Sequence, residues 1–410
     1  MSVTQRLKNV QRPQSSSFAS RFGLEELKQG HAKRGKRVFE LYGADVLEWG
    51  HDNEHLSQVM VESEKAGYGG HYAQHTNVVK EFKNAVADFQ KNVRKVDSAP
   101  EDIVPVAGIA NGWSIIHFCL LDPGSEMLGI GPAHYFWGPS SYLGYYQAEA
   151  VCSKSDGDWE PDLDDLRSKL NPRTKAIVLD HPNNPTGTIY SEKALKGIVN
   201  IAGEHDIPVI SDEIYDLVVF DGLENVGSLA STAGDVPVIT MYSTSKFLMK
   251  PGWRLGYMCF HDPEGKITEF KKTVDMVANT YGHGTSSVST LVMAAGVRAF
   301  KGPFGEGKKM MKKIQRSRDY TFKRLNEIEG LSCTKSRATM YAFPRVNEIG
   351  RKWKDDEEFV AEMMKREGVL FVPGSFFGDV GRGHFRTLLL PSVEILQLVY
   401  DRLENFMKST

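Results

Sequence analysis

The sequence predicts an α/β protein made of a large and a small domain, and two observations carry this prediction. The chain has 410 residues, which is more than one hydrophobic core usually serves. Through its middle, short apolar runs rich in β-branched residues alternate with helical patterns, as is typical of parallel strands joined by crossover helices. The runs are apolar throughout, which fits a sheet that helices cover on both faces.

The expected elements of the large domain follow this alternation. Apolar runs predict strands over 175–180 (KAIVLD), 208–212 (PVISD) and 236–243 (VPVITMYS), and a helix over 191–204 separates the first two. A turn with polar residues follows each strand. Because the carboxyl ends of parallel strands are where α/β proteins bind ligands, we expect a functional site at these turns.

The pattern changes after Lys301 and predicts a smaller α+β domain. A long amphipathic helix is expected over 307–328, followed by short apolar strands and by helices near 355–366 and 391–407. We expect four segments along the chain: a mobile N-terminal arm over 1–21, a segment over 22–70 that packs with the small domain, a large domain over 71–300 and a small domain over 301–410.

Composition and charge narrow the possible partners. The formal net charge is −2, so no strong field would attract nucleic acid or an acidic membrane. The 12 histidines show no metal-binding spacing such as H-E-x-x-H, and no metal is expected. The four cysteines form no C-x-x-C pair, which argues against disulfides and zinc; they are Cys119, Cys152, Cys259 and Cys333. No apolar run of about 18 residues and no secretory signal is visible, so we expect a cytoplasmic protein that acts on small molecules.

One turn carries a lysine in a setting that suits covalent chemistry. The segment 243–257 reads STSKFLMKPGWRLGY and begins where the predicted strand over 236–243 ends. Lys246 would supply an amine at this edge of the sheet, and Arg254 would bind an anion. A Ser-Lys pair alone is more often part of an ordinary surface loop, so the prediction depends on the neighbouring turns.

Two further turns follow the other predicted strands. The segment 181–187 (HPNNPTG) comes after KAIVLD; it is ordinary turn chemistry, but it also aims the Asn184 amide toward the strand ends, with a cis peptide bond expected before Pro185. The segment 211–215 (SDEIY) follows the next strand and places Asp212 at its buried end. A buried carboxylate needs a cationic partner, and a protonated pyridine ring would serve.

Taken together, NNPTG, SDEIY and S-x-S-K followed by GWRLGY, in this order and spacing, resemble the class I/II aminotransferases of fold type I, which depend on pyridoxal 5′-phosphate (PLP). The resemblance runs from about Val38 onward, and the segment 370–391 (LFVPGSFFGDVGRGHFRTLLLP) is most similar to the alanine-aminotransferase-like branch. It implies the aspartate-aminotransferase fold, with a mostly parallel seven-stranded sheet between helices in the PLP-binding domain and a smaller α+β domain.

The resemblance also implies roles for four residues at the strand ends. Lys246 would hold the cofactor as a Schiff base and then act as the general base at the substrate's Cα. Asp212 would pair with the pyridine nitrogen and keep the ring protonated, as an electron sink. Tyr215 and Asn184 would hydrogen-bond the phenolic oxygen of the ring.

Further residues match the positions that hold the cofactor's phosphate. Ser243 and Arg254 match two phosphate ligands. The backbone amides of Gly108, Ile109 and Ala110 would complete the phosphate site, because VAGIANGW resembles a small-residue turn that opens a helix.

Around the ring and the substrate, the resemblance implies four more contacts. His134 takes the place of the usual aromatic over the cofactor ring, so stacking is expected, with proton transfer as its alternative role. Tyr72 is the candidate to reach a phosphate in a neighbouring subunit. Arg386 matches the arginine that grips the substrate α-carboxylate, and Ala44 takes the place of the glycine in a substrate-facing Gly-Asp-Pro.

The activity implied is transfer of an amino group between an L-amino acid and a 2-oxo acid in ping-pong half-reactions, by a homodimer with shared active sites. An alternative is that the same cofactor chemistry serves elimination, replacement, cyclisation or oxidation in specialised biosynthesis, because fold and cofactor residues do not dictate which bond is made next. A ligand-sensing regulator of this fold would need a DNA-binding module, and no basic recognition helix is evident.

Overall fold

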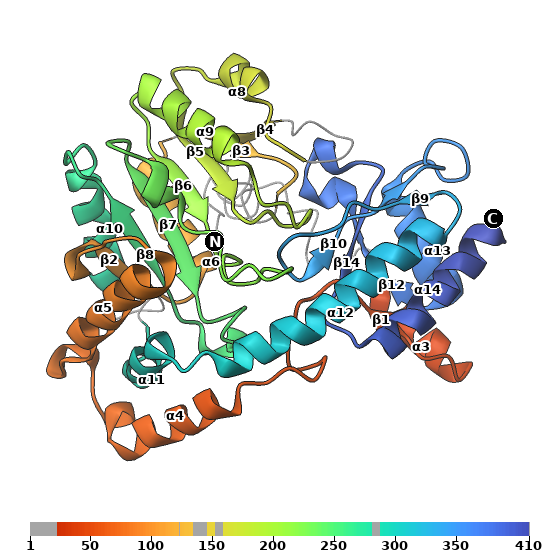
Figure 1. Cartoon of the computed structure of the whole chain (residues 1–410), viewed down its shortest axis with the longest axis horizontal. Helices are drawn as coiled ribbons and strands as arrows, with labels where there is room; N and C mark the ends of the chain where they lie inside the picture. Colours follow the sequence, from red (N-terminus) through yellow and green to blue (C-terminus); the bar gives the residue numbers. More distant parts are fainter. Residues whose placement is uncertain (1–22, 123, 134–145, 152–158, 281–287, 410) are drawn as a thin grey trace, which may run out of the picture.

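The computed structural model of the chain describes residues 23–409 except 123, 134–145, 152–158 and 281–287. The arm expected over 1–21, and with it His134, lie outside the described residues. The described helices and strands form two parts that lie side by side, and the longest strands belong to the part drawn mainly in green (Figure 1).

One seven-stranded sheet organises the larger part. Its order is β2-β8-β7-β6-β5-β3-β4, and among these strands only β8 runs antiparallel to both of its neighbours. In chain order the strands are β2 (Ile103–Val106), β3 (Ser125–Ile130), β4 (Tyr146–Val151), β5 (Thr174–Asp180), β6 (Val209–Asp212), β7 (Val238–Ser243) and β8 (Gly256–His261). The predicted mostly parallel, seven-stranded sheet is therefore confirmed.

Alternate residues of the central strands point to opposite faces of the sheet and build two cores. In β5, Ile177 and Leu179 pack in the cluster that contains the apolar side of α9 (Glu192–Glu204). Val178, between them, belongs to the cluster that contains α6 (Ile109–Leu120). This period of two follows from the strand pleat. Because both faces are covered, the strands are mainly apolar instead of alternating between apolar and polar residues.

The remaining helices of this part surround the sheet. They are α4 (Glu54–Lys65), α5 (Val78–Phe89), α8 (Leu163–Lys169), α10 (Thr268–Thr280) and α11 (Thr290–Lys301). The helix α11 packs against both α4 and α5, and α10 packs against α6 (Figure 1).

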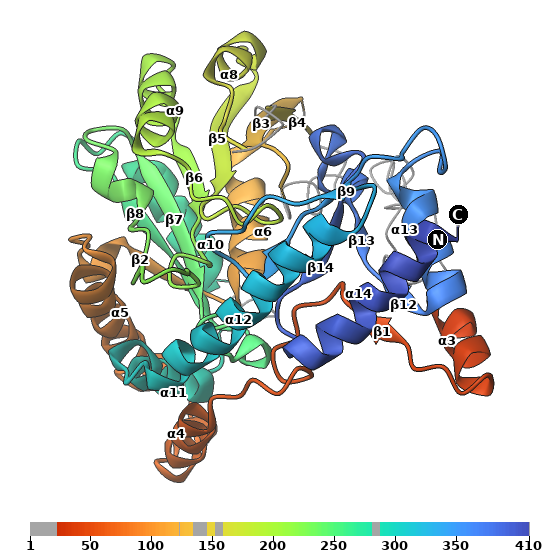
Figure 2. The ribbon, with the colours of Figure 1, turned by 45° about the vertical axis from the view of Figure 1, so that its right-hand side comes forward.

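The smaller part begins with α12 (Gly305–Glu327), the long helix predicted from the amphipathic pattern, which runs from the sheet toward the C-terminal helices (Figures 1 and 2). Three short strands form an antiparallel sheet in the order β10-β14-β13. The elements after α12 are β9 (Leu331–Ser332), β10 (Tyr341–Ala342), β11 (Arg345–Val346), α13 (Asp356–Glu367), β12 (Val369–Leu370), β13 (Val372–Pro373), β14 (Phe385–Leu388) and α14 (Val393–Lys408).

The N-terminal segment lies against this smaller part. The strand β1 (Phe39–Glu40) pairs in parallel with β12, and α3 (Leu24–Lys33) lies beside the C-terminal helices (Figures 1 and 2). A ring nitrogen of His31, near the end of α3, is 2.9 Å from the carbonyl oxygen of Met364. Residues at the two ends of the chain therefore share one sheet and one core, while the exact boundaries of the four segments stay a prediction.

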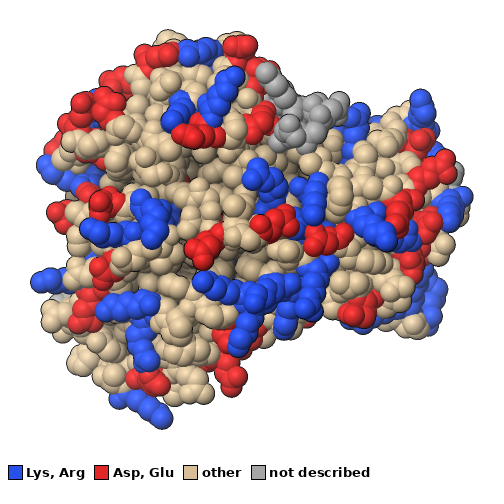
Figure 3. All heavy atoms as spheres, viewed as in Figure 1, with Lys and Arg blue, Asp and Glu red and all other residues tan. Residues whose placement is uncertain are grey.

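The surface of the molecule carries charges of both signs. On the face drawn in Figure 3, acidic and basic side chains are interspersed over most of the area, in keeping with a net charge of −2. Among the described helices, none is both long and apolar enough to cross a membrane.

Candidate active site

The three turns singled out in the sequence meet at one edge of the large sheet. The strands β5, β6 and β7 are neighbours and run parallel, so their carboxyl ends lie together. Asp180, the last residue of β5, is in register with Asp212, the last residue of β6. Ser243 ends β7 and leads into the turn with Lys246. The turn after β5 contains a cis peptide bond between His181 and Pro182. The prediction of a cis bond before Pro185 is therefore wrong. Both peptide bonds precede a proline, so the sequence permits a cis bond at either position.

Lys246 extends into this edge from a turn that is itself buried. The side chains of Phe247, Leu248 and Met249 are each at most 5% exposed and anchor the turn in the core. The Lys246 amine lies 5.9 Å from the centre of the Tyr215 ring. No hydrogen bond or ion pair from a described residue is recorded for this amine. The buried turn therefore holds the amine in place and leaves it available to react.

Asp212 is a buried carboxyl group that faces this amine. Its side chain accepts a 3.2 Å hydrogen bond from the backbone N–H of Ile214 and is 3% exposed. Burial raises the pKa of Asp212 to about 7, although the Ile214 N–H, Trp113 and Lys246 favour its ionised form. No lysine or arginine of the described residues forms an ion pair with it. A cation bound at this point would restore its charge.

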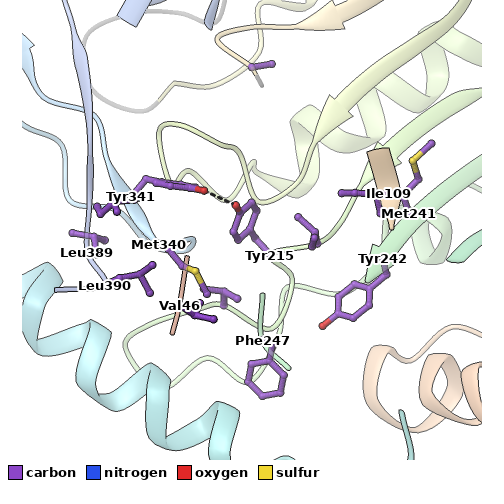
Figure 4. Close-up of a cluster of buried hydrophobic side chains, with 14 of the residues drawn as sticks. Val46, Ile109, Tyr215, Met241, Tyr242, Phe247, Met340, Tyr341, Leu389 and Leu390 are labelled. Atoms are coloured by element: carbon purple, nitrogen blue, oxygen red, sulfur yellow. Dashed lines mark hydrogen bonds between the residues drawn. The ribbon is translucent and has the colours of Figure 1, made fainter. Parts of the chain in front are cut away.

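Tyr215 faces a second tyrosine from the smaller part of the molecule. Its hydroxyl oxygen lies 2.9 Å from that of Tyr341, the first residue of β10 (Figure 4). The two rings meet edge to face, with their centres 5.8 Å apart. This contact joins the turn after β6 to the small antiparallel sheet.

Arg386 is a buried cation on the adjacent strand β14. It donates 3.0 and 2.7 Å hydrogen bonds to the side-chain oxygen of Asn184 and the carbonyl oxygen of Tyr42, and its side chain is buried. Its guanidinium carbon lies 4.1 Å from the ring centre of Tyr341 and 4.9 Å from that of Phe377. No described carboxylate pairs with Arg386, and its buried Nε–H has no recorded acceptor. An anion from outside the chain would satisfy both.

A guanidinium lies beside the helix start where α6 begins. Gly108 precedes this helix with a φ of 77°, and a Cβ placed on it would lie 2.6 Å from a guanidinium nitrogen of Arg254. A Cβ on Gly256 would lie 3.0 Å from the Cβ of Ser243 and 3.4 Å from the Cα of Gly108. These contacts bring the start of α6, the end of β7 and the turn with Arg254 to one point, and glycine is needed there because the backbones approach so closely.

Backbone N–H groups at this helix start are available as hydrogen-bond donors. Among the described residues, no acceptor is recorded for the N–H groups of Ile109 and Ala110. The hydroxyl of Ser243 lies 3.0 Å from that of Ser245. The first N–H groups of a helix have no partner inside the helix, so a dianion at this point would gain hydrogen bonds as well as the helix dipole.

Of two further predicted residues, one borders this cluster and the other lies apart from it within one chain. Ala44 is half-buried in the segment that also supplies the Tyr42 carbonyl to Arg386, so it borders the site. Tyr72 is 73% exposed, and no described contact links it to the other site residues of the same chain.

Two residues were missed by sequence reasoning. Tyr341 lies between Tyr215 and Arg386, and the signal that marks it is its place three residues before the proline in MYAFP. Arg94 is fully buried and forms ion pairs with Glu213 and Asp216, which flank Tyr215 on the turn after β6. Its local sequence, KNVRK, is polar and suggests only a surface helix.

The fold and the site define a class of enzyme. A mostly parallel seven-stranded sheet with one internal antiparallel strand, and with a lysine and a buried carboxyl at its carboxyl edge, fits the fold type I architecture of the aminotransferase structures that it resembles. Residues 48–399 match the family model "Aminotransferase class I and II". The chain belongs to this family.

Individual relatives agree on the activity. The chain is 31% identical over 316 residues to glutamate-pyruvate aminotransferase AlaA of Escherichia coli K12, and this alignment covers 76% of each protein. It is 32% identical over 326 residues to an alanine aminotransferase of Mycobacterium tuberculosis H37Rv, covering 75% of this chain and 71% of that protein. An alanine aminotransferase structure from Pyrococcus furiosus superposes with a TM-score of 0.90 at 38% identity over 100% of both chains.

The chain is therefore a PLP-dependent aminotransferase, similar to the alanine-aminotransferase-like branch, and amino-group transfer is favoured over the alternative fates of the same chemistry. The described residues fit this cofactor in two ways. Asp212 is a buried carboxyl without an ion-pair partner, as a protonated ring requires. The crowding of Gly108 against Arg254 forms a cradle that a side chain at residue 108 would fill.

Proposed function

We propose that Lys246 binds PLP covalently and then serves as the proton-transfer base at the substrate's Cα. The observation that carries this proposal is the position of its amine, which lies 5.9 Å from the Tyr215 ring, has no hydrogen bond to a described residue and favours the ionised form of the buried Asp212. When bound, PLP supplies an aldehyde that forms a Schiff base with an amine and a protonated ring that withdraws electrons from Cα.

Three polar side chains would tune this chemistry. Asp212 keeps its charge when a cation lies beside it, and so would hold a proton on the ring nitrogen. Tyr215 would donate its hydroxyl proton to the phenolic oxygen. The side-chain oxygen of Asn184 is occupied by Arg386, so the amide N–H₂ of Asn184 is free to donate to the same oxygen.

The phosphate site of the proposal lies at the start of α6. Arg254 supplies a charge there, Ser243 a hydroxyl, and the turn of Gly108, Ile109 and Ala110 backbone amides. His134 would cover the ring by stacking.

Arg386 would bind the substrate α-carboxylate, with Ala44 at the border of the same pocket. Its two hydrogen bonds to Asn184 and Tyr42 fix the plane of the guanidinium and leave the Nε–H for an incoming anion. Because the relatives include a glutamate-pyruvate aminotransferase, we propose glutamate as amino donor and pyruvate as acceptor in ping-pong half-reactions.

The active unit would be a homodimer in which Tyr72 reaches the phosphate bound to the other subunit. The support for this part is the 73% exposure of an aromatic side chain that has no described contact with its own site. The large domain over 71–300 would hold the cofactor, and the segment over 301–410, together with the N-terminal strand β1 that pairs with it, would close on the substrate.

An absorbance experiment tests the central assignment. The wild-type holoenzyme should absorb between about 300 and 550 nm, and glutamate added without an oxo acid should bleach this band as the amino group is transferred. Lys246→Ala should abolish the covalent band and lower kcat by about 10²- to 10⁴-fold. Lys250→Ala, four residues away on the same loop, is the matched control and should keep the band. Retention of the band in Lys246→Ala would refute the proposal.

A further inference from the structure

Tyr341 contacts both halves of the site. Its hydroxyl oxygen lies 2.9 Å from the hydroxyl of Tyr215, on the cofactor side. Its ring lies under the guanidinium of Arg386, with 4.1 Å between the guanidinium carbon and the ring centre, on the substrate side. The side chain is only 3% exposed. One residue thus links the tyrosine proposed to tune the cofactor to the arginine proposed to bind the substrate.

The backbone around Tyr341 holds this ring in place. Tyr341 is paired with Leu388 in the antiparallel ladder between β10 and β14. Its carbonyl oxygen accepts a 2.8 Å hydrogen bond from the hydroxyl of Ser336, and its N–H donates over 3.3 Å to the hydroxyl of Thr339. Because Arg386 lies on the same strand β14, the ring and the guanidinium are fixed relative to each other by the sheet.

We propose that Tyr341 is a positioning residue with two separable actions: its hydroxyl donates a hydrogen bond to Tyr215, and its ring supports the guanidinium of Arg386. The first action leaves Tyr215 with its own proton available for the phenolic oxygen of the cofactor. Hydrogen bonds in such a chain strengthen one another, so Tyr215 becomes the better donor. The second action is a cation–π contact that orients Arg386 before a carboxylate arrives.

The charged groups around Tyr341 favour its role as donor. Burial raises the pKa of the Tyr341 hydroxyl, but the positive charges of Lys246 and Arg386 and the hydrogen bond with Tyr215 outweigh this effect and lower the pKa overall. Asp180, at the end of β5, acts in the opposite direction. Either hydroxyl of the pair is placed to donate, and the positive charges of Lys246 and Arg386, which make the Tyr341 hydroxyl more acidic, favour Tyr341 as the donor.

The hydroxyl is tested by Tyr341→Phe, which keeps the ring. The readout is the apparent pKa of the cofactor absorbance in the holoenzyme, titrated without substrate. A weaker donor at Tyr215 leaves the phenolic oxygen more basic, so the apparent pKa should rise by about half a pH unit. Tyr400→Phe removes a buried hydroxyl that bonds Thr321 and Thr387 but neither Tyr215 nor Arg386, and should leave the titration unchanged.

The ring is tested by Tyr341→Leu, which removes both actions. The readouts are KM for glutamate and the dissociation constant of propionate, a carboxylate without an amino group, followed by its effect on the absorbance. Both constants should rise about 3- to 30-fold relative to Tyr341→Phe, the range for loss of a cation–π contact. Tyr341→Phe itself should keep both constants within about 2-fold of wild type.

The inference rests on the proposed function of Lys246, and different experimental results would refute the inference and the proposed function. A wild-type holoenzyme whose absorbance survives Lys246→Ala would refute the proposed function. If that absorbance depends on Lys246 but Tyr341→Phe titrates like wild type and Tyr400→Phe, the hydroxyl action is refuted. If Tyr341→Leu binds propionate as well as Tyr341→Phe does, the ring action is refuted.

Discussion

Arg386 donates a 3.0 Å hydrogen bond to the side-chain oxygen of Asn184, although 202 residues separate the two in the chain. The bond determines which end of the Asn184 amide faces the rest of the site, because the oxygen is occupied and only the N–H₂ group remains. It also holds the guanidinium beside the turn that follows β5. The proposed substrate clamp and the proposed cofactor contact are therefore parts of one hydrogen-bonded unit.

Replacing Arg386 by lysine should weaken substrate binding more than it slows the chemical step. A lysine keeps the charge but cannot donate to Asn184 and Tyr42 while presenting a planar pair of N–H groups to a carboxylate. We expect KM for glutamate to rise about 10- to 100-fold, the range for lost hydrogen bonds to a charged group, in steady-state kinetics. Arg382→Lys, at an exposed arginine on the same segment, is the control. Equal KM values in the two variants would contradict the assignment.

The site residues that could be predicted from sequence are those that directly follow an apolar run predicted to form a strand. Asp212 ends a continuous apolar run, and Lys246 begins the turn after another, so their meeting follows from the parallel order of β6 and β7. The strands β5, β6 and β7 and the long helix α12 were predictable for the same reason, because a hydrophobic pattern is a local property of the sequence.

Contacts between distant segments could not be predicted in this way. Arg94 looks like a surface residue in KNVRK, yet it is fully buried because two carboxylates of the turn after β6 meet it there. Tyr341 belongs to a strand of two residues, too short for any periodic signal. Its partners Tyr215 and Arg386 come from other elements, and only the tertiary fold brings the three together.

Removing Arg94 should destabilise the whole protein. Its guanidinium pairs with Glu213 and, over 2.5 Å, with Asp216, and all three side chains are 0% exposed. Breaking a buried pair from one side leaves carboxylates uncompensated, so we expect Arg94→Met to lower the free energy of unfolding by about 3–5 kcal/mol in chemical denaturation. Arg167→Met, which removes a solvent-exposed ion pair with Glu204, is the control and should change the stability little.

A second variant separates charge from packing at Arg94. In the triple variant Arg94→Met, Glu213→Gln, Asp216→Asn the uncompensated charges are gone, so part of the lost stability should return. If the triple variant is no more stable than Arg94→Met, loss of packing explains the effect and the buried ion pairs do not.

Tyr72 should contribute to PLP binding only in the active site of a second subunit. We expect Tyr72→Phe to weaken PLP affinity about 2- to 10-fold, the range for one lost hydrogen bond, in a titration followed by absorbance. Tyr68→Phe, four residues earlier, is the control. Sedimentation should give a dimer for both variants. Unchanged PLP affinity in Tyr72→Phe would contradict a shared active site.

The pH dependence of the apoenzyme should report on Asp212. The pKa of this carboxyl is raised from 3.8 to about 7, so between these values the folded chain holds a proton that the unfolded chain releases. The stabilising contribution of protonated Asp212 is thus full below about pH 4 and is lost as the pH rises through about 7. Asp212→Asn cannot ionise, so its apoenzyme should have a higher Tm than wild type at pH 8 but not at pH 4.

Adding PLP should reverse this order at pH 8. A protonated ring nitrogen beside Asp212 compensates the ionised carboxylate, so wild type should gain more in Tm from saturating PLP than Asp212→Asn does. Asp97→Asn, at a carboxylate on the surface, controls for a change of net charge and should follow wild type throughout. Parallel curves of Tm against pH for wild-type and Asp212→Asn apoenzymes would mean that Asp212 is already ionised without the cofactor. The buried carboxyl would then not be the group that selects a cationic ring.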